Sequence, residues 1–137
     1  MNGIEWVVDA HGCDPQALRN PELLRELFER IIAGLRLRPI GGTQWHQFPN
    51  TGGITGLCLL AESHLACHTF PEFGSLCLNL FCCVVREAWN FEGELTAAFG
   101  AASVSVRTVV RSYGSSEELR LEPFATARDL ARESQRR

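Results

Sequence analysis

The chain has 137 residues, of which 45% are hydrophobic and 21% are charged, and its formal net charge is −3 at pH 7. This length and composition predict one ordered domain over residues 1–137 and exclude a disordered chain. The small negative charge gives no electrostatic reason to bind nucleic acid or an anionic membrane. No run approaches the roughly 18 apolar residues that span a bilayer, and the first residues lack the pattern of a signal peptide. We therefore expect a cytoplasmic protein.

One amphipathic helix is predicted near the start of the chain, after a first strand. Residues 4–10 (IEWVVDA) have the β-branched and aromatic content of a strand. Asn20 and Pro21 then mark the start of a helix, as its N-cap and its first helical residue. Apolar residues follow at spacings of three and four, and Gly34 is predicted to end the helix. The apolar stripe of this helix is expected to lie on a sheet.

Further strands are predicted in the middle of the chain. One lies within residues 39–48, before a turn at residues 49–53 (PNTGG). Residues 56–61 (GLCLLA) are almost wholly apolar and predict a buried strand. Residues 76–85 predict another strand whose side chains alternate between two faces. The core face would bear Leu76, Leu78, Leu80 and Cys82, and the other face Cys77, Asn79, Phe81 and Cys83.

The last part of the chain predicts a helix, a strand and a charged tail. Residues 92–99 form the helix, which Gly100 closes, and residues 104–111 alternate as a half-exposed strand. Residues 115–137 are charged and predict a surface helix or tail. The element order predicts an α+β fold, a two-layer α/β sandwich with a largely antiparallel sheet and two main helices packed on one face.

Six cysteines stand at positions 13, 58, 67, 77, 82 and 83. Without a secretory signal, an even number of cysteines does not predict disulfides. The sequence has no CxxC pair, which argues against a structural zinc site. Four of the cysteines lie in apolar runs, where a thiol is typically a small buried hydrophobe; these are Cys58, Cys67, Cys77 and Cys82. At most one or two of the six are expected to carry chemistry.

Residues 61–72 (AESHLACHTFPE) concentrate polar and ionisable side chains among core-like residues. Buried polar groups are costly unless they are paired or used. His64 and His68 have the spacing of helical metal ligands, but Pro71 and the flanking β-rich runs predict a strand and a turn, which disfavours a metal. A cysteine–histidine hydrolase built on Cys83 and His68 lacks a visible third residue. The remaining interpretation is a hydrogen-bonded polar network at the end of a strand.

The same twelve residues resemble the processing and active-site segment of prokaryotic S-adenosylmethionine decarboxylases, which reads ESHxxxHTxPE with an aromatic residue before the proline. Other motifs fall at family-like spacing: HGCD from residue 11, WHQF at 45–48, GITG at 53–56 and FCC at 81–83. The resemblance covers roughly residues 4–111. It implies a pyruvoyl-dependent decarboxylase that is made as a proenzyme.

The resemblance further implies that the chain cuts itself between Glu62 and Ser63, into residues 1–62 and 63–137 that stay associated. The Ser63 hydroxyl would attack the Glu62 carbonyl and replace the amide by an ester. Elimination across Ser63 would then give dehydroalanine, which hydrolyses to a pyruvoyl group. A serine hydroxyl is a weak nucleophile without assistance, and His68 matches the family position of the base.

Other site residues follow from family positions in the same way. Thr55 stands where the family commonly has a serine that helps processing, and His64 is expected to support substrate binding or processing. Cys83 matches the cysteine that donates a proton to the substrate carbon, a role that suits a thiol with an ordinary pKa of about 8.5. Glu72 matches an acid that helps to hold the substrate, and Phe48 is expected to stack on an adenine.

The implied cofactor is the pyruvoyl group derived from Ser63, with no pyridoxal phosphate and no metal. Its ketone would form an imine (a Schiff base) with the substrate amine and accept electrons as carbon dioxide leaves. The resemblance implies two partners, the small-molecule substrate and a second copy of the chain, because members of this family form homodimers in which both protomers contribute to each site. The product would be the aminopropyl donor for spermidine synthesis.

Two departures from the family pattern DxFTCG bear on the substrate, since Asn79 replaces the aspartate and Val84 the glycine. S-Adenosylmethionine carries a sulfonium cation, so that the loss of a carboxylate would weaken its binding. A pyruvoyl-dependent decarboxylase of arginine or ornithine is therefore an alternative, and a non-catalytic regulatory paralogue is a second one. The presence of Ser63, His68 and Cys83 together argues against the paralogue.

Overall fold

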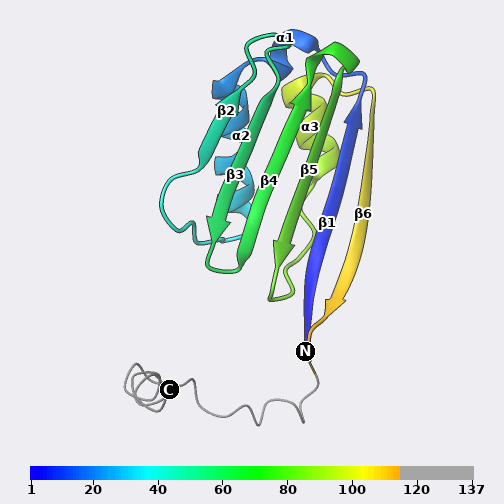
Figure 1. Cartoon of the computed structure of the whole chain (residues 1–137). Coiled ribbons are helices and arrows are strands. Elements are labelled where there is room, and N and C mark those ends of the chain that lie inside the picture. The colour runs from blue at the N-terminus through cyan, green and yellow to red at the C-terminus, as the bar shows by residue number, and fades with distance from the viewer. Residues whose placement is uncertain (115–137) are drawn as a thin grey trace, which may run out of the picture.

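The computed structural model describes residues 1–114, which form an open sheet with helices against one of its faces (Figure 1). This described part contains six strands, three α-helices and one 3-10 helix. In chain order they are β1 (Asn2–His11), α1 (Pro15–Leu18), α2 (Pro21–Gly34), β2 (Gln44–Gln47), β3 (Ile54–Leu60), β4 (Ser63–Phe70), η1 (Pro71–Phe73), β5 (Ser75–Cys82), α3 (Phe91–Phe99) and β6 (Ser103–Ser112). The tail predicted at residues 115–137 lies outside the described residues.

All neighbouring strands of the sheet run antiparallel, in the order β2-β3-β4-β5-β1-β6. Strands β2 to β5 follow one another along the chain, whereas β1 lies between β5 and β6. Within β1, Val8 pairs with Leu78 of β5 on one side and with Val106 of β6 on the other. Helices α2 and α3 cover the same face (Figure 1). The predicted α+β sandwich with two main helices on one face of the sheet is confirmed.

The core lies between the helices and the sheet face that they cover. The core face of β5 is the predicted one, and its four side chains are buried. These are Leu76, Leu78, Leu80 and Cys82. The buried stripe of α2 packs in the same cluster, at the spacing that predicted the helix. It consists of Leu24, Leu27, Phe28 and Ile31.

Helix α2 begins after Asn20 and ends at Gly34, as predicted. The Asn20 side chain caps it by accepting a hydrogen bond of 3.0 Å from a first-turn N–H. Gly34 does not turn the chain; Arg36 does, in the left-handed conformation with φ of 54°. A side chain at position 34 would collide with the Trp89 ring, so that close packing explains this glycine.

Several strand predictions are wrong in detail. Strand β3 is not buried on both faces: Leu57 and Leu59 are 48% and 58% exposed, because no described element covers their side of the sheet. Strand β5 ends at Cys82, earlier than predicted. Strand β6 is an edge strand and is exposed along most of its length rather than half-exposed. Helix α1 was not predicted, although Asp14 before Pro15 repeats the signal that begins α2.

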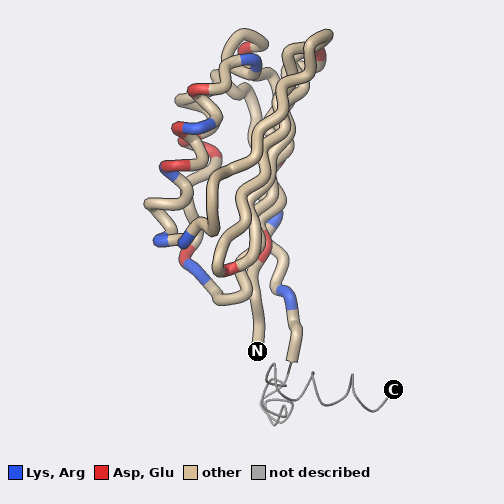
Figure 2. The backbone as a smooth tube through the Cα atoms, turned by 60° about the vertical axis from the view of Figure 1, so that its left-hand side comes forward, with Lys and Arg blue, Asp and Glu red and all other residues tan. Residues whose placement is uncertain are grey.

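Figure 2 shows the helices and the sheet as two layers, with charged residues spaced along the helix layer. Within residues 1–114, no helix covers the second face of the sheet, which we call the open face. The open face mixes apolar and polar side chains, including Leu57, Leu59, Ala66, His68, Cys77 and Phe81. None of the described helices has both the length and the apolar character needed to cross a bilayer.

Replacing Asn20 by alanine should lower the free energy of unfolding by about 1 kcal/mol, because the first turn of α2 loses its capping acceptor. Urea unfolding followed by circular dichroism measures this loss. All chains in the comparison should carry Ser63→Ala, so that none can be cut. Asn20→Asp keeps an acceptor and is the matched control, which should stay close to the parent. Equal losses in both variants would contradict the capping role.

Candidate active site

The predicted cleavage junction lies in the turn between β3 and β4. Leu60 and Ser63 pair across this hairpin, so that Ala61 and Glu62 form a two-residue turn. Ser63 has φ of 153°, a backbone conformation that costs a residue with a side chain about 1–3 kcal/mol. The strained residue is therefore the one directly after the bond that is expected to break.

Polar partners flank this junction on both sides. The Ser63 hydroxyl lies 2.9 Å from His64 Nδ1, within reach for proton transfer. The Glu62 carbonyl accepts a hydrogen bond of 2.8 Å from the Cys83 N–H, a donor that would stabilise negative charge on this oxygen. Within one chain, His64 rather than His68 is thus the imidazole beside the nucleophile.

The side chain of Glu62 is a buried carboxylate that is only 1% exposed. Arg38 binds it twice, through its backbone N–H and its Nε, each at 3.1 Å. Arg86 Nη2 lies 3.8 Å from the same carboxylate. Burial by itself raises the pKa of Glu62, but the hydrogen bonds and the charge of Arg38 outweigh it and lower the pKa. Glu62 is therefore ionised at neutral pH.

A second group of predicted site residues lies near the other end of β4. His68 Nδ1 is 2.6 Å from Thr55 Oγ1 across the β3–β4 pair, and this contact orients the imidazole. The Phe48 ring is 40% exposed and packs on His68, with 5.5 Å between the ring centroids. Glu72 follows in η1 and is exposed.

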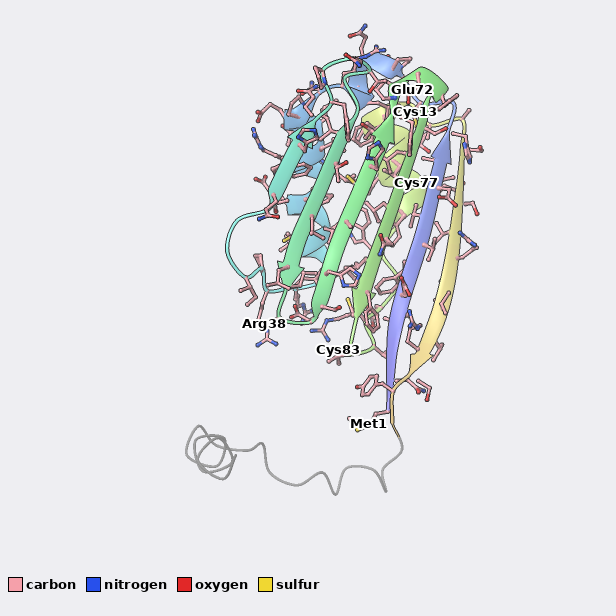
Figure 3. All side chains as sticks on the ribbon, viewed as in Figure 1. Met1, Cys13, Arg38, Glu72, Cys77 and Cys83 are labelled. Carbon is pink, nitrogen blue, oxygen red and sulfur yellow. The ribbon has the colours of Figure 1, made fainter. Side chains whose placement is uncertain are left out.

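One chain keeps these two groups apart. Ser63 and His68 are five residues apart on one strand, which corresponds to about 16 Å at the usual rise of a strand. Figure 3 shows Cys83 and Arg38 at one end of the sheet and Glu72 at the opposite end. We call Glu62, Ser63, His64 and Cys83 the cleavage group, and Phe48, Thr55, His68 and Glu72 the His68 group. The sequence predicted these residues but not their separation.

A shallow hollow of about 430 Å³ lies on the open face. Asn79 lines it beside Glu5 and Asp9, whose carboxylates lie 2.6 Å from Arg111 and 3.5 Å from Arg107. The hollow therefore retains carboxylates although Asn79 stands where the family pattern has an aspartate. In residues 1–114, no three histidine, cysteine or acidic side chains gather as metal ligands would.

All six cysteines lie within residues 1–114 and are free thiols. Cys83 is half-buried directly after β5, beside the cleavage turn. Its neighbour Cys82 lies in the core, where burial raises its pKa to about 11, and burial raises the pKa of Cys67 to about 12. Cys77 is exposed on the open face, so that the expectation of a buried thiol is wrong there.

Residues 4–112 match the S-adenosylmethionine decarboxylase family. The chain belongs to this family. An S-adenosylmethionine decarboxylase proenzyme from Thermococcus gammatolerans is 36% identical over 81 residues, which are 59% of this chain and 55% of the relative. The match thus spans about half the length of that relative.

Longer matches exist to two other members of the S-adenosylmethionine decarboxylase family. A proenzyme of the same name from Caldicellulosiruptor saccharolyticus is 29% identical over 112 residues, which are 80% of this chain and 87% of the relative. The crystal structure of the adenosylmethionine decarboxylase from Aquifex aeolicus VF5 is similar with a TM-score of 0.71 and 25% sequence identity. That similarity covers 83% of this chain and 93% of the Aquifex chain. The fold of this chain is therefore the fold of that decarboxylase.

The residues that surround Glu62 were not found from the sequence. Arg38 follows α2 and Arg86 follows β5, and only the folded sheet brings them together. The available signal was Glu62 itself, because a charged residue next to an apolar strand requires a partner if it is buried. The sequence gives no indication of which arginines supply that partner.

Alkylation of the folded protein at pH 8 should leave Cys67 and Cys82 unmodified. The thiolate is the reactive form, and pKa values of about 12 and 11 keep both thiols protonated at that pH. Peptide mass spectrometry after iodoacetamide treatment measures the modification. Protein unfolded in urea is the control, in which both residues should react. Reaction of either residue in the folded chain at the rate seen in urea would contradict the burial.

Proposed function

We propose that this chain is the cytoplasmic proenzyme of a pyruvoyl-dependent S-adenosylmethionine decarboxylase, which cuts itself between Glu62 and Ser63. The observation that carries the proposal is the geometry of the junction. Ser63 has a strained backbone, and its hydroxyl lies beside the His64 imidazole. The Glu62 carbonyl that it would attack accepts a hydrogen bond from the Cys83 N–H. The names of the Thermococcus and Caldicellulosiruptor relatives support the same activity. The product would supply aminopropyl groups for spermidine synthesis.

The first step is an attack by Ser63 on the carbonyl that precedes it. The Ser63 hydroxyl gives its proton to His64 Nδ1 as its oxygen bonds to the Glu62 carbonyl carbon. The Cys83 N–H stabilises the negative charge on the carbonyl oxygen. The C–N bond then breaks, the nitrogen takes up the proton, and an ester joins the two residues.

The second step opens the ester by elimination. An imidazole, which we assign to His68, removes the Cα proton of Ser63. The ester C–O bond breaks at the same time, and Glu62 leaves as the new C-terminus with a free α-carboxylate. The resulting dehydroalanine takes up water and loses ammonia, which leaves a pyruvoyl group on residues 63–137. Once formed, this group supplies an electrophilic ketone that accepts electrons during decarboxylation. We assign to the Cys83 thiol the proton that returns to the product carbon.

A second copy of the chain would complete the site as a homodimer. His68 is about 16 Å from Ser63 along the strand, too far to act within one chain. If the open faces of two copies packed against each other in opposite orientations, the His68 group of one copy would lie over the cleavage group of the other. Leu57 and Leu59 are large apolar side chains exposed on this face, in line with a surface that becomes covered. A two-fold axis would give two equivalent sites.

The His68 group would then contribute to substrate binding as well as to self-cleavage. We assign the exposed ring of Phe48 to stacking on adenine, an interaction worth about 1–3 kcal/mol on a nucleic-acid base. Glu72 is assigned to holding the substrate. S-Adenosylmethionine is cationic, but the carboxylates of Glu5 and Asp9 in the hollow are each already paired with an arginine and add little net attraction for it. Arginine and ornithine are also cationic and are the substrates to compare.

Denaturing mass spectrometry should show the parent as two fragments, residues 1–62 and 63–137, the second beginning with a pyruvoyl group instead of serine. Ser63→Ala removes the nucleophile and should stay in one piece without activity. Carbon dioxide released from S-adenosylmethionine, arginine and ornithine, measured side by side, should be greatest with S-adenosylmethionine. A parent that stays whole contradicts the function, and a preference for arginine or ornithine contradicts the substrate.

Cys83→Ala is the control that separates cutting from turnover. It keeps the backbone N–H at the junction, so that cutting should proceed as in the parent. It removes the proton donor, which should slow turnover by about a hundredfold or more. Turnover equal to the parent would remove Cys83 from this role.

Co-expression of a Ser63→Ala chain with a differently tagged His68→Ala chain should restore cutting. Alone, each variant should stay whole. The Ser63→Ala chain lacks the nucleophile, and the His68→Ala chain lacks the base that removes the Cα proton in the elimination step. In a mixed dimer, Ser63 of the His68→Ala chain meets the intact His68 of its neighbour, and only that chain should be cut. Capture through both tags isolates the mixed dimer, and mass spectrometry identifies the cut chain. Mixed dimers without any cutting would contradict the shared site.

A further inference from the structure

The side chain of Glu62 takes no part in the steps proposed above, although it belongs to the bond that breaks. It is the one buried charged side chain among the described residues. An ion in such a place is destabilising unless it is paired and hydrogen-bonded. Its partners come from two segments that flank the cleavage turn, one after α2 and the other after β5.

The segment after α2 binds the turn through Arg38. The Arg38 carbonyl accepts a hydrogen bond of 2.8 Å from the Ala61 N–H, while its own N–H and its Nε donate to the two Glu62 carboxylate oxygens at 3.1 Å. The segment then runs along β3, where the Ile40 N–H donates to the Leu59 carbonyl at 2.8 Å. The turn is thus fixed from the side of β3 at its backbone and at its side chain.

The segment after β5 binds the same turn from the other side. Arg86 Nη2 lies 3.8 Å from the Glu62 carboxylate, and Arg86 Nε donates to the Leu35 carbonyl at 3.3 Å. The same segment contains Cys83, whose N–H donates to the Glu62 carbonyl. This segment therefore holds the carbonyl of Glu62 by a hydrogen bond and places a positive charge near its carboxylate.

We propose that the Glu62 carboxylate is a positioning residue for self-cleavage, clamped by Arg38 and Arg86 so that Ser63 keeps its strained backbone. The inference rests on the proposed function and adds a role for a side chain that the chemistry itself does not use. Unusual backbone angles persist only where the surroundings over-determine them. Charge-assisted hydrogen bonds are the strongest such contacts in the turn. The clamp would keep the Glu62 carbonyl on Cys83 and within reach of the serine hydroxyl.

Glu62→Gln tests the clamp because it keeps the size of the side chain and removes its charge. Self-cutting of newly synthesised chains is followed over time on denaturing gels, with and without neutral hydroxylamine, which cleaves an ester but not a peptide bond. Glu94→Gln is the matched control: it breaks the 3.0 Å ion pair with Arg30 in the helix layer, away from the turn. Thermal unfolding by circular dichroism, with Ser63→Ala added to each chain, shows whether each variant is folded at the assay temperature.

We expect Glu62→Gln to be folded and to be cut about tenfold more slowly or worse, the factor expected when a hydrogen bond to a charged group is lost. Hydroxylamine should release no extra fragment, because the clamp acts on the attack that forms the ester. Glu94→Gln should be cut at the parental rate. Loss of packing alone would lower the unfolding temperature without this selective loss of ester.

Cutting of folded Glu62→Gln at the parental rate would overturn the clamp, and so would slow cutting with abundant ester released by hydroxylamine. If Glu62→Gln is unfolded, Arg86→Gln decides by the same criteria, because it removes one cation and leaves the carboxylate on Arg38. A parent chain that is never cut would overturn the proposed function and the clamp together. A parent that is cut alongside an equally fast Glu62→Gln overturns the clamp alone.

Discussion

A single backbone hydrogen bond, from the Cys83 N–H to the Glu62 carbonyl, joins the β3–β4 turn to the end of β5. It places the carbonyl, the serine hydroxyl and the cysteine at one corner of the sheet. The antiparallel pairing of β3, β4 and β5 determines this meeting, because the register aligns Ser63 with Leu60 on one side and Cys82 on the other. The junction is therefore a product of the sheet as a whole and not of its local sequence.

Successive side chains along each strand point to opposite faces of the sheet, and the two faces differ in role. One face packs under α2 and α3 and forms the core, whereas the open face carries His68, Phe81 and the exposed leucines of β3. The cleavage group and the His68 group lie at opposite ends of one copy. In the homodimer that we propose, a two-fold axis would bring each group of one copy to the other group of its neighbour.

The fold was predictable because its signals are local. Hydrophobic periodicity gave the strands and α2, and Asn20 before Pro21 located the start of that helix. The motif indicated the candidate site residues through family resemblance. The alternation of side chains along a strand, however, predicts which face a residue occupies and not how far apart two site residues lie. The ends of strands were misplaced for a related reason: the apolar run after Cys82 continues although the chain turns there. The partners of Glu62 are non-local, and no pattern in the sequence announces them.

The strand order decides what would hold the products of the cut together. Within the described residues, β1, β2 and β3 belong to the first fragment and β4, β5 and β6 to the second. Strand β1 therefore lies between two strands of the other fragment, and β3 still pairs with β4 across the cut. The proposed scission would sever no ladder of hydrogen bonds, so that the nicked protein would remain one cooperative body. Once denatured, however, it must reassemble from two molecules at a rate that depends on concentration, whereas the uncut precursor folds from one. The covalent link would thus make assembly of the sheet independent of concentration, whereas the finished sheet would not require it.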